Sequence, residues 1–498
     1  MASSAGPNGH AATGIEGLDQ ILGGGLPPDR LYLVEGDPGS GKTTLGLQFL
    51  REGIQRGEKV LYVTLSETRS ELDAVARSHG WELDGMAIHE LSTSGEGGFT
   101  PDDQYTFFHP SEVELGETTK AVLSEVERVA PTRVVFDSLS EMRLLAREPL
   151  RYRRQILGLK QFFVGRHCTV VLLDDRTSQA GDLQLQSLAH GVVTLEQLAP
   201  EYGAERRRLR TVKLRGVRFQ GGYHDFVIAS GGLQVFPRLI AAESRGHADR
   251  GTASTGLETF DRLLGGGLDR GASTLFIGPA GAGKSAIATQ IAVTAADRGE
   301  HVAIYLFDEG LDTFRRRAAG LGADVERHLA SGQLVLTQVD PAELSPGEFA
   351  HQIRSAVDRD HASVVVIDSL NGYINAMPEE RFLLAQLHEL FMFLRQRNVV
   401  AISIVAQHGM IGAMQAPVDL SYLADNVVLL RFFEAAGRVR QAISILKKRT
   451  GAHEKTIREL RLEASGITLG EPLTEFDGVL TGVPTFRGAD MRQPVEGA

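Results

Sequence analysis

The sequence predicts an α/β fold in two tandem domains, each with a mainly parallel β-sheet flanked by helices. A glycine-rich loop of the form G-x-x-x-x-G-K-[ST] occurs twice, at residues 36–43 and 278–285. Each copy follows an apolar run and opens a helical pattern, and more such runs alternate with helical patterns downstream. Alternation of this kind is typical of parallel sheets covered by helices.

The chain is a tandem duplication. The two loops are 278 − 36 = 242 residues apart, and the same offset relates Asp19 to Asp261 and Glu67 to Glu309. Self-similarity at a fixed spacing indicates repeated structural units. The predicted organisation is a flexible N-terminus (1–12), a first domain (13–241), a polar linker (242–253), a second domain (254–484) and a short tail (485–498).

In the first half, the apolar run at 31–34 leads into the loop, and a helix is expected at 42–56 directly after it. Its other expected strands are 59–65, 133–136 and 169–173, its other helices are 69–79, 118–129 and 150–166, and a basic extended segment at 206–215 and a hairpin at 223–236 complete it. The second half repeats this order, with expected strands at 301–307, 363–367, 399–405 and 442–448. A nucleotide is expected at the carboxyl ends of such strands.

Composition sets limits on partners and location. The 498 residues carry a net charge of −11, which provides no overall attraction to nucleic acid. Cys168 is the only cysteine, so no intramolecular disulfide can form, and its apolar surroundings predict a core position. No apolar run is long enough to span a bilayer, and the first residues lack a signal-peptide core. A cytoplasmic protein without a membrane anchor is expected.

Both glycine-rich loops have the residues of a phosphate-binding loop. Glycines let backbone N–H groups surround phosphate, the helix N-terminus favours its negative charge, and the lysine reaches the β- and γ-phosphates. The residues predicted to bind the nucleotide are Gly39, Ser40, Gly41, Lys42, Thr43 and Thr44 in the first half and Gly281, Ala282, Gly283, Lys284, Ser285 and Ala286 in the second.

A magnesium site is predicted beside each loop. Asp137 and Asp368 each end an apolar strand pattern downstream of a loop, and a carboxylate in that position holds Mg²⁺ together with the loop hydroxyl of Thr43 or Ser285. An aspartate at the end of a buried strand is often only a helix cap. The distance from the phosphate-binding loop favours the metal role.

A second acidic position follows the next strand of each half. It reads Ser66-Glu67 in the first half and Asp308-Glu309 in the second. A carboxylate there can orient or deprotonate an attacking water or hydroxyl. The alternative interpretation is helix N-capping by Ser66 or Asp308. The catalytic interpretation is favoured for the second half and evenly balanced for the first.

Two pairs of basic residues recur at equivalent places. Strand alternation places Lys213 and Arg215 on one face, and likewise Lys447 and Arg449. One interpretation is a solvated edge strand that resists aggregation. The other is a trans-acting pair that touches the γ-phosphate bound to a neighbouring subunit. Recurrence in both halves favours the trans-acting role, which requires an oligomer.

These residues together resemble the KaiC family of RecA-like ATPases. The resemblance rests on Thr-Gly-Ile-Glu-Gly-Leu-Asp at 13–19, on Val-Lys-Leu-Arg-Gly at 212–216 and on Asp-Leu-Ser-Tyr-Leu-Ala-Asp at 419–425, and it extends from about residue 13 to 487. It implies RecA-like P-loop domains that use ATP and Mg²⁺ and assemble into a double-ring homohexamer, with ATP between neighbouring subunits. It also implies a KaiB-like regulatory partner and a role in timing or signalling.

Several site residues are assigned by the resemblance. Glu67 and the Asp308/Glu309 pair match the family's paired catalytic glutamates, and the two basic pairs match its trans-acting residues. Ser421 matches the serine of the family's autophosphorylated Ser-Thr pair. The resemblance therefore implies ATPase activity in the first domain and serine autokinase activity in the second.

Three positions depart from the family pattern. Ser66 replaces the first glutamate of the first pair, which predicts slow hydrolysis and a role in assembly for that domain. Asp308 replaces the equivalent glutamate and remains a carboxylate. Tyr422 replaces the threonine acceptor, so Ser421 or Tyr422 is left as the candidate acceptor. Ser421 can also be an ordinary hydroxyl near a subunit interface.

Two other functions compete with an ATPase and autokinase. RecA-like rings also include DNA-dependent motors, for which the arginine-rich segment 206–210 is a candidate contact, but the acidic balance disfavours this function. In the other alternative, ATP serves mainly to assemble a hexameric scaffold without significant kinase activity.

Overall fold

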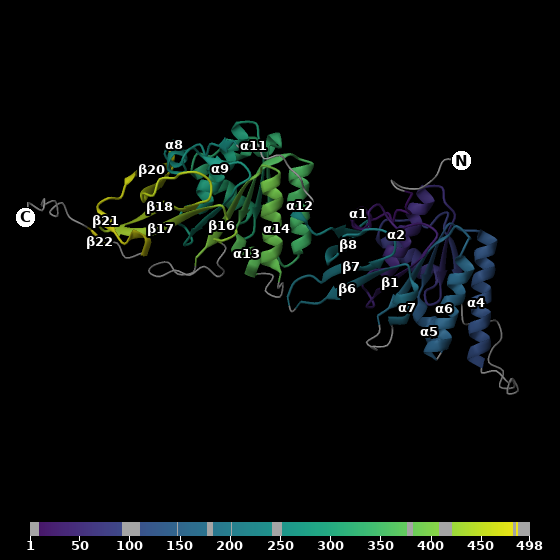
Figure 1. Cartoon of the computed structure of the whole chain (residues 1–498). Coiled ribbons are helices and arrows are strands. Elements are labelled where there is room, and N and C mark those ends of the chain that lie inside the picture. Colours follow the sequence, from purple (N-terminus) through teal and green to yellow (C-terminus); the bar gives the residue numbers. More distant parts are fainter. Residues whose placement is uncertain are drawn as a thin grey trace, which may run out of the picture. The chain divides into compact units, whose positions relative to one another are not determined.

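The computed structural model describes residues 9–91, 110–146, 148–176, 183–200, 202–241, 251–375, 382–407, 421–481 and 485–486. The chain divides into two compact units, Met1–Arg238 and Leu239–Ala498, which are described separately below (Figure 1). Each unit contains one nine-stranded sheet with helices on both faces.

The first sheet has the order β3-β2-β4-β5-β1-β6-β7-β8-β9. Neighbouring strands are parallel from β3 to β6 and antiparallel from β6 to β9. The strands are β1 (Leu31–Gly36), β2 (Val60–Thr64), β3 (Ala87–Glu90), β4 (Arg133–Asp137), β5 (Thr169–Asp175), β6 (Gly191–Leu198), β7 (Arg206–Leu214), β8 (His224–Ala229) and β9 (Gly232–Phe236).

The second sheet repeats this topology in the order β14-β13-β15-β16-β12-β17-β18-β19-β20. Its strands are β12 (Ser273–Gly278), β13 (His301–Leu306), β14 (Leu334–Gln338), β15 (Ala362–Asp368), β16 (Val400–Ala406), β17 (Asn426–Ala435), β18 (Arg438–Lys448), β19 (Arg458–Glu463) and β20 (Gly466–Pro472). Short ribbons accompany it, β10 (Thr252–Ala253) with β11 (Leu268–Asp269) and β21 (Phe476–Asp477) with β22 (Thr485–Phe486), together with the 3₁₀ turn η2 (Val479–Thr481).

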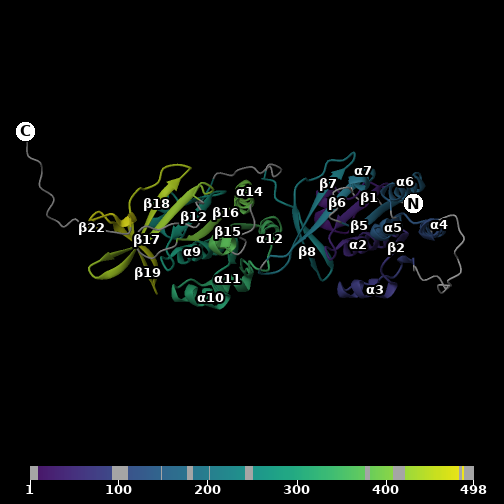
Figure 2. The same cartoon turned by 90° about the horizontal axis from the view of Figure 1, so that it is seen from below.

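Helices cover both faces of each sheet and complete a large apolar core on each face. The first sheet carries α1 (Glu16–Leu22), α2 (Lys42–Gln55) and α3 (Arg69–Ser78) on one face and α4 (Pro110–Val129), α5 (Leu139–Ala146), α6 (Pro149–Phe163) and α7 (Leu183–Leu188) on the other. The second carries α8 (Glu258–Leu263), α9 (Lys284–Asp297), α10 (Leu311–Gly320) and α11 (Val325–Ser331) opposite α12 (Pro346–Asp358), α13 (Leu370–Asn375) and α14 (Leu383–Gln396). Figure 2 shows α10 and α11 on one side of the second sheet and α14 on the other.

The predicted fold class is confirmed, and most predicted elements lie within two residues of the observed ones. The helix expected at 42–56 is α2, and the predicted hairpin at 223–236 is the antiparallel pair β8 and β9. Two central strands, β6 and β17, were not predicted, although each pairs directly with the strand that leads into a glycine-rich loop. Both begin as continuous apolar runs that are buried on both faces, and periodicity alone does not assign such a run to a strand.

The segment predicted as a linker, 242–253, lies mostly outside the described residues. Its last two residues form β10, which pairs with β11 in the second unit. The hydrogen bond from the Ala241 backbone N–H to the Glu389 carboxylate, at 2.8 Å, likewise ties the residue before this segment to the second unit. The compact second unit therefore includes residues on both sides of the predicted linker.

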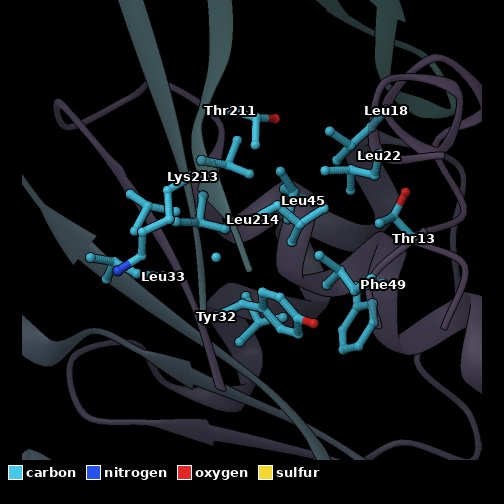
Figure 3. Close-up of a pocket in the computed structure, with 16 residues that line it drawn as sticks. Thr13, Leu18, Leu22, Tyr32, Leu33, Leu45, Phe49, Thr211, Lys213 and Leu214 are labelled. Atoms are coloured by element: carbon cyan, nitrogen blue, oxygen red, sulfur yellow. The ribbon is translucent and has the colours of Figure 1, made fainter. Parts of the chain in front are cut away.

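The first unit contains a small apolar cavity of about 20 Å³ between β1 and α2 (Figure 3). Leu45 and Phe49 of α2 face it, and the aliphatic stem of Lys213 borders it. In Figure 3 the Lys213 nitrogen points away from Leu45 and Phe49. A space of this size has room for one water at most. It is therefore a packing defect and not a nucleotide pocket.

Candidate nucleotide-binding and phosphoryl-transfer sites

Each glycine-rich loop connects a central strand to a helix, as the motif requires. In the first unit β1 ends at Gly36 and α2 begins at Lys42, and the loop passes through left-handed φ values of 79° at Gly39 and 98° at Gly41. A Cβ atom on Gly36 would lie 2.6 Å from the Leu195 carbonyl oxygen. Glycine is needed at these positions because other residues would clash or be strained.

The second loop has nearly the same geometry. β12 ends at Gly278, α9 begins at Lys284, and φ is 79° at Gly281 and 101° at Gly283. Ala282 and Ala286 are buried, and so are Ser40 and Thr44 in the first loop. Each loop thus presents backbone N–H groups at a helix N-terminus, which is the arrangement that binds phosphate.

The two loop lysines share backbone contacts but differ in their charged partners. Lys42 Nζ donates to the carbonyls of Gly36 and Asp37 at 3.0 and 2.9 Å and lies 2.9 Å from Asp175 Oδ1. Lys284 Nζ donates to the carbonyls of Gly278 and Pro279 at 2.8 and 2.6 Å. Burial lowers the pKa of Lys284 to about 8, while the charge of Asp368 opposes that shift.

The predicted metal ligands meet in both units. Thr43 Oγ1 donates to Asp137 Oδ2 at 2.7 Å, and the Tyr62 hydroxyl donates to the same oxygen at 2.5 Å. In the second unit Ser285 hydrogen-bonds to Asp368. Burial raises the pKa of both aspartates, against the hydrogen bonds that lower it. Both aspartates are followed by a cis peptide bond.

These donors fit a magnesium ion that also binds a nucleotide. Mg²⁺ in such sites usually takes one or two protein oxygens and completes its shell with water and phosphate. Each unit offers one carboxylate and one hydroxyl beside a phosphate-binding loop, and no cluster of three or more carboxylate, histidine or cysteine side chains occurs among the described residues. Ser40 Oγ and Glu67 Oε2 are also buried without a hydrogen-bond partner in the described part of the chain. The first site therefore has polar atoms that a ligand and its water could satisfy.

The acidic residues after β2 and β13 are held differently. Glu67 is half-buried, and burial followed by repulsion from Asp137 and Glu71 raises its pKa. Glu309 accepts hydrogen bonds from Arg317 on both carboxylate oxygens, the shortest being 2.8 Å. Asp308 Oδ2 accepts a hydrogen bond from the Ser369 hydroxyl at 2.5 Å. Among the described residues, Glu67 Oε2 in the first unit therefore has no hydrogen-bond partner, although the sequence predicted slower hydrolysis in that domain.

The capping interpretation of Ser66 and Asp308 is wrong. The N-cap of α3 is Thr68, which forms a reciprocal capping box with Glu71, and the N-cap of α10 is Gly310, which makes no side-chain cap. Both helices begin two residues beyond the acidic position. Asp308 is therefore available for other contacts.

The basic pairs lie at the end of each sheet away from the loop of the same unit. Arg215 donates its backbone N–H to His190, which in turn donates to Leu31, the first residue of β1, whereas the loop follows the last residue of that strand. Arg449 is linked in the same way through Asp425 to Ser273, the first residue of β12. Alternation holds as predicted, because Lys213 and Arg215 contact carbonyls of Gln186 and Ser187 on one side.

The candidate acceptors lie beside the second basic pair. Lys447 Nζ donates to the Ser421 carbonyl at 2.8 Å, and Arg449 Nη2 donates to the Tyr422 carbonyl at 2.8 Å. Tyr422 is exposed and Ser421 is half-buried. The candidate acceptors therefore lie at the same end of the strands as Lys447 and Arg449. This end is opposite to the one that carries the loop of their own unit.

Sequence reasoning missed three side chains at these sites. They are Tyr62, which binds Asp137, Asp175, which binds Lys42, and Arg317, which binds Glu309. The sequence did carry a signal for Asp175, because two aspartates directly follow the predicted strand at 169–173. Arg317 lies among three consecutive arginines on one helix, so no pattern distinguished it.

A family model described as the KaiC ATPase matches residues 11–240 and 253–474. The chain belongs to the KaiC ATPase family. It is 26% identical over 485 residues to the circadian clock protein KaiC3 of Synechocystis sp., covering 95% of this chain and 94% of that protein. The circadian clock oscillator protein KaiC of Picosynechococcus sp. is 25% identical over 484 residues, 96% of this chain and 93% of the relative. The circadian clock oscillator protein KaiC of Thermosynechococcus vestitus is 26% identical over 486 residues, which cover 96% of this chain and 92% of the relative.

The family match covers both duplicated halves, so each sheet with its loop is one KaiC-type domain. Identities of about 25% establish common descent and leave room for different site residues. In the described part of this chain, no helix combines the length and the apolar character needed to cross a bilayer.

Proposed function

We propose that this KaiC-family chain is an Mg-ATP-dependent ATPase that works as a homohexamer, and that its second domain transfers the γ-phosphoryl group of ATP to Ser421 or Tyr422 of a neighbouring subunit. The observation that carries the proposal is the division of each site. The phosphate-binding loop lies at one end of the sheet, and Lys447, Arg449 and Ser421 lie at the other. A complete site then needs two subunits.

Hydrolysis would use residues of one loop and one glutamate. Lys42 and the loop N–H groups bind the β- and γ-phosphates, and a magnesium ion held by Thr43 and Asp137 would neutralise their charge. Glu67 orients a water and takes its proton as the water oxygen bonds to the γ-phosphorus. The bond from that phosphorus to the bridging oxygen breaks, and ADP and phosphate leave. Lys213 and Arg215 of the neighbour stabilise the charge that develops.

Transfer to protein would follow the same course in the second domain. The Ser421 hydroxyl replaces water as the nucleophile and gives its proton to the carboxylate at Asp308. The γ-phosphorus then ends on the serine oxygen, and ADP leaves. Lys447 and Arg449 bind the backbone carbonyls of Ser421 and Tyr422. The same neighbouring subunit would therefore supply both the cations that contact the phosphate and the acceptor.

Mixed assemblies test the proposal directly. Lys284→Ala removes the phosphate-binding lysine but keeps the acceptors, and Ser421→Ala with Tyr422→Phe removes the acceptors but keeps the nucleotide site. When the two proteins are co-assembled with γ-labelled ATP, the label is expected on the Lys284→Ala subunit, which is distinguished by a size tag. Native mass spectrometry of the same sample reads the number of subunits.

The controls separate the parts of the proposal. Each variant alone should remain unlabelled. If the wild-type protein becomes labelled but the co-assembled variants do not, transfer between subunits is excluded. If phosphate is released and no protein becomes labelled, the protein is only an ATPase. A protein that assembles with ATP but neither releases phosphate nor becomes labelled would be a scaffold.

The DNA-dependent alternative receives little support from the arginine-rich strand. Arg207 pairs with Glu205 at 2.6 Å, and Arg208 pairs with Glu196 at 2.9 Å and stacks on Tyr223. These cations are already neutralised by nearby groups. Stimulation of phosphate release by single-stranded DNA would revive this alternative.

A further inference from the structure

Arg317 holds the carboxylate of Glu309 from two directions. Its Nη2 lies 2.8 Å from Oε2, and its Nε lies 3.1 and 3.3 Å from Oε1 and Oε2. The Arg317 Nη1 donates to Thr289 Oγ1 of α9 at 3.3 Å, and Thr289 in turn donates to the Ser285 carbonyl at 2.7 Å. The guanidinium is therefore held between the Glu309 carboxylate and α9, the helix that starts at the phosphate-binding loop.

The first domain lacks this anchor. The residue 242 positions before Arg317 is Val75, and the one before Thr289 is Leu47. Both are apolar and belong to the packing around α2 and α3. The equivalent glutamate, Glu67, has a buried oxygen without a partner in the described part of the chain. At these equivalent positions, both within the described residues, the second site thus has a cation and the first has none.

The difference has a direct chemical consequence. A carboxylate that takes a proton from water loses its charge and with it the charge-assisted hydrogen bonds that depend on the charge. Glu309 would weaken its three hydrogen bonds to Arg317, whereas Glu67 makes no such bonds within the described part of the chain. Arg317 also lies close enough to Asp368 to lower its pKa. The guanidinium therefore interacts electrostatically with Asp368 as well as with Glu309.

We propose that Arg317 is a positioning residue that keeps Glu309 as an ion-paired carboxylate, so that water activation in the second site is suppressed and bound ATP is retained for transfer to the protein. This inference rests on the function proposed above. Asp308, which accepts a hydrogen bond from the Ser369 hydroxyl, remains the carboxylate that would take the proton of the neighbouring subunit's acceptor.

The test compares phosphate release by full-length variants in a Glu67→Gln background, which weakens hydrolysis in the first domain. Arg317→Val, the residue found in the first domain, is expected to raise phosphate release by about tenfold, since a positioned base contributes on the order of 10²–10⁴-fold. Arg317→Lys keeps the charge without the two-pronged geometry and should restore most of the suppression. It also serves if Arg317→Val folds poorly.

A second substitution shows whether Arg317 acts through Glu309. Adding Glu309→Gln to Arg317→Val should remove the gain. Arg315→Val is the matched control, because Arg315 lies on the same helix and pairs with exposed Glu326 at 3.3 Å. It should change nothing.

The outcomes are distinct. Unchanged or reduced phosphate release in Arg317→Val, or a gain that persists with Glu309→Gln, would overturn the role of Arg317. If the wild-type protein binds ATP but never hydrolyses or transfers it, the proposed function fails instead.

Discussion

Lys42 Nζ lies 2.9 Å from Asp175 Oδ1 in the first domain, and the residue in the same register of the second sheet is Ala406. The register is set by Gly36 opposite Asp175 and Gly278 opposite Ala406. A γ-phosphate that binds Lys42 must therefore share the ammonium with a carboxylate. At the equivalent position of the second sheet, Ala406 carries no charge, so the two sites are expected to differ in how a terminal phosphate would bind.

Removal of the Asp175 charge should favour ATP over ADP in the first domain. In Asp175→Ala the repulsion between the carboxylate and the γ-phosphate is lost, and we expect the ratio of ATP to ADP affinity to rise by about fivefold, roughly 1 kcal/mol. Calorimetric titration with ATP and with ADP in a Lys284→Ala background measures this ratio of affinities. Asp73→Ala, which removes an exposed charge 3.9 Å from Arg69, is the control and should leave the ratio unchanged.

Hydrolysis in the first domain should depend on the charged form of Glu67. Because burial and repulsion from Asp137 raise its pKa, the loss of rate on acidification should begin at a higher pH than for an ordinary glutamate. Glu67→Gln should lower the rate by about a hundredfold. Phosphate release is measured against pH in the Lys284→Ala protein, with and without Glu67→Gln. The profiles give both the pH at which the rate falls and the loss caused by the substitution.

Glu71→Gln provides a matched control for this profile. Glutamine can keep the capping contact to Thr68 while one repulsive charge is lost. The acid side of the profile should then move to lower pH. A profile that stays in place in Glu71→Gln and survives Glu67→Gln would contradict the role of Glu67 as base.

ATP binding to the second domain should take up a proton in mildly alkaline solution. Burial lowers the pKa of Lys284 to about 8, and a bound phosphate favours the charged ammonium, so its pKa should rise on binding. At about pH 9 the free lysine is largely neutral and must gain a proton, whereas at about pH 7 it is already charged. Calorimetry in two buffers with different ionisation enthalpies measures the uptake. It should persist in Lys42→Ala and disappear in Lys284→Ala.

The free energy of unfolding of the first domain should depend on Glu58. Arg133 is 1% exposed, and its guanidinium is held by Glu58 at 2.6 Å and by the carbonyls of Ala12 and Phe49. Glu58→Ala leaves a buried charge without its counter-ion, which typically costs about 3–5 kcal/mol.

Denaturant unfolding followed by fluorescence of Trp81, the single tryptophan, reports this domain alone. Glu127→Ala breaks an exposed pair with Arg166 and should cost less than about 1 kcal/mol. Equal costs for the two substitutions would contradict the buried ion pair.

Local signals in the sequence were sufficient for the two loops and the strands before them. Glycine, lysine and a hydroxyl residue at fixed spacing specify a backbone path and a chemistry together, so Gly36–Thr43 and Gly278–Ser285 needed no tertiary information. The same holds for the strands that end at Asp137 and Asp368, because continuous apolar runs mark strands buried on both faces. Strand alternation alone put Lys213 with Arg215.

Contacts between segments far apart in the sequence could not be obtained in this way. Glu309 pairs with Arg317 and Lys42 pairs with Asp175 because of how α10 and β5 pack beside the loops. The local sequence around an arginine or aspartate does not indicate which residue it will pair with. Likewise, the separation of Ser421 and Lys447 from their own loop follows from the antiparallel pairing of β17 and β18. The amino-acid sequence thus determined that there are two phosphate-binding loops in a duplicated α/β chain, since that chemistry is local. Only the tertiary structure decided that the charged partners of the two loops differ and that Ser421 and Lys447 lie away from the loop of their own unit, because these relationships depend on distance in space.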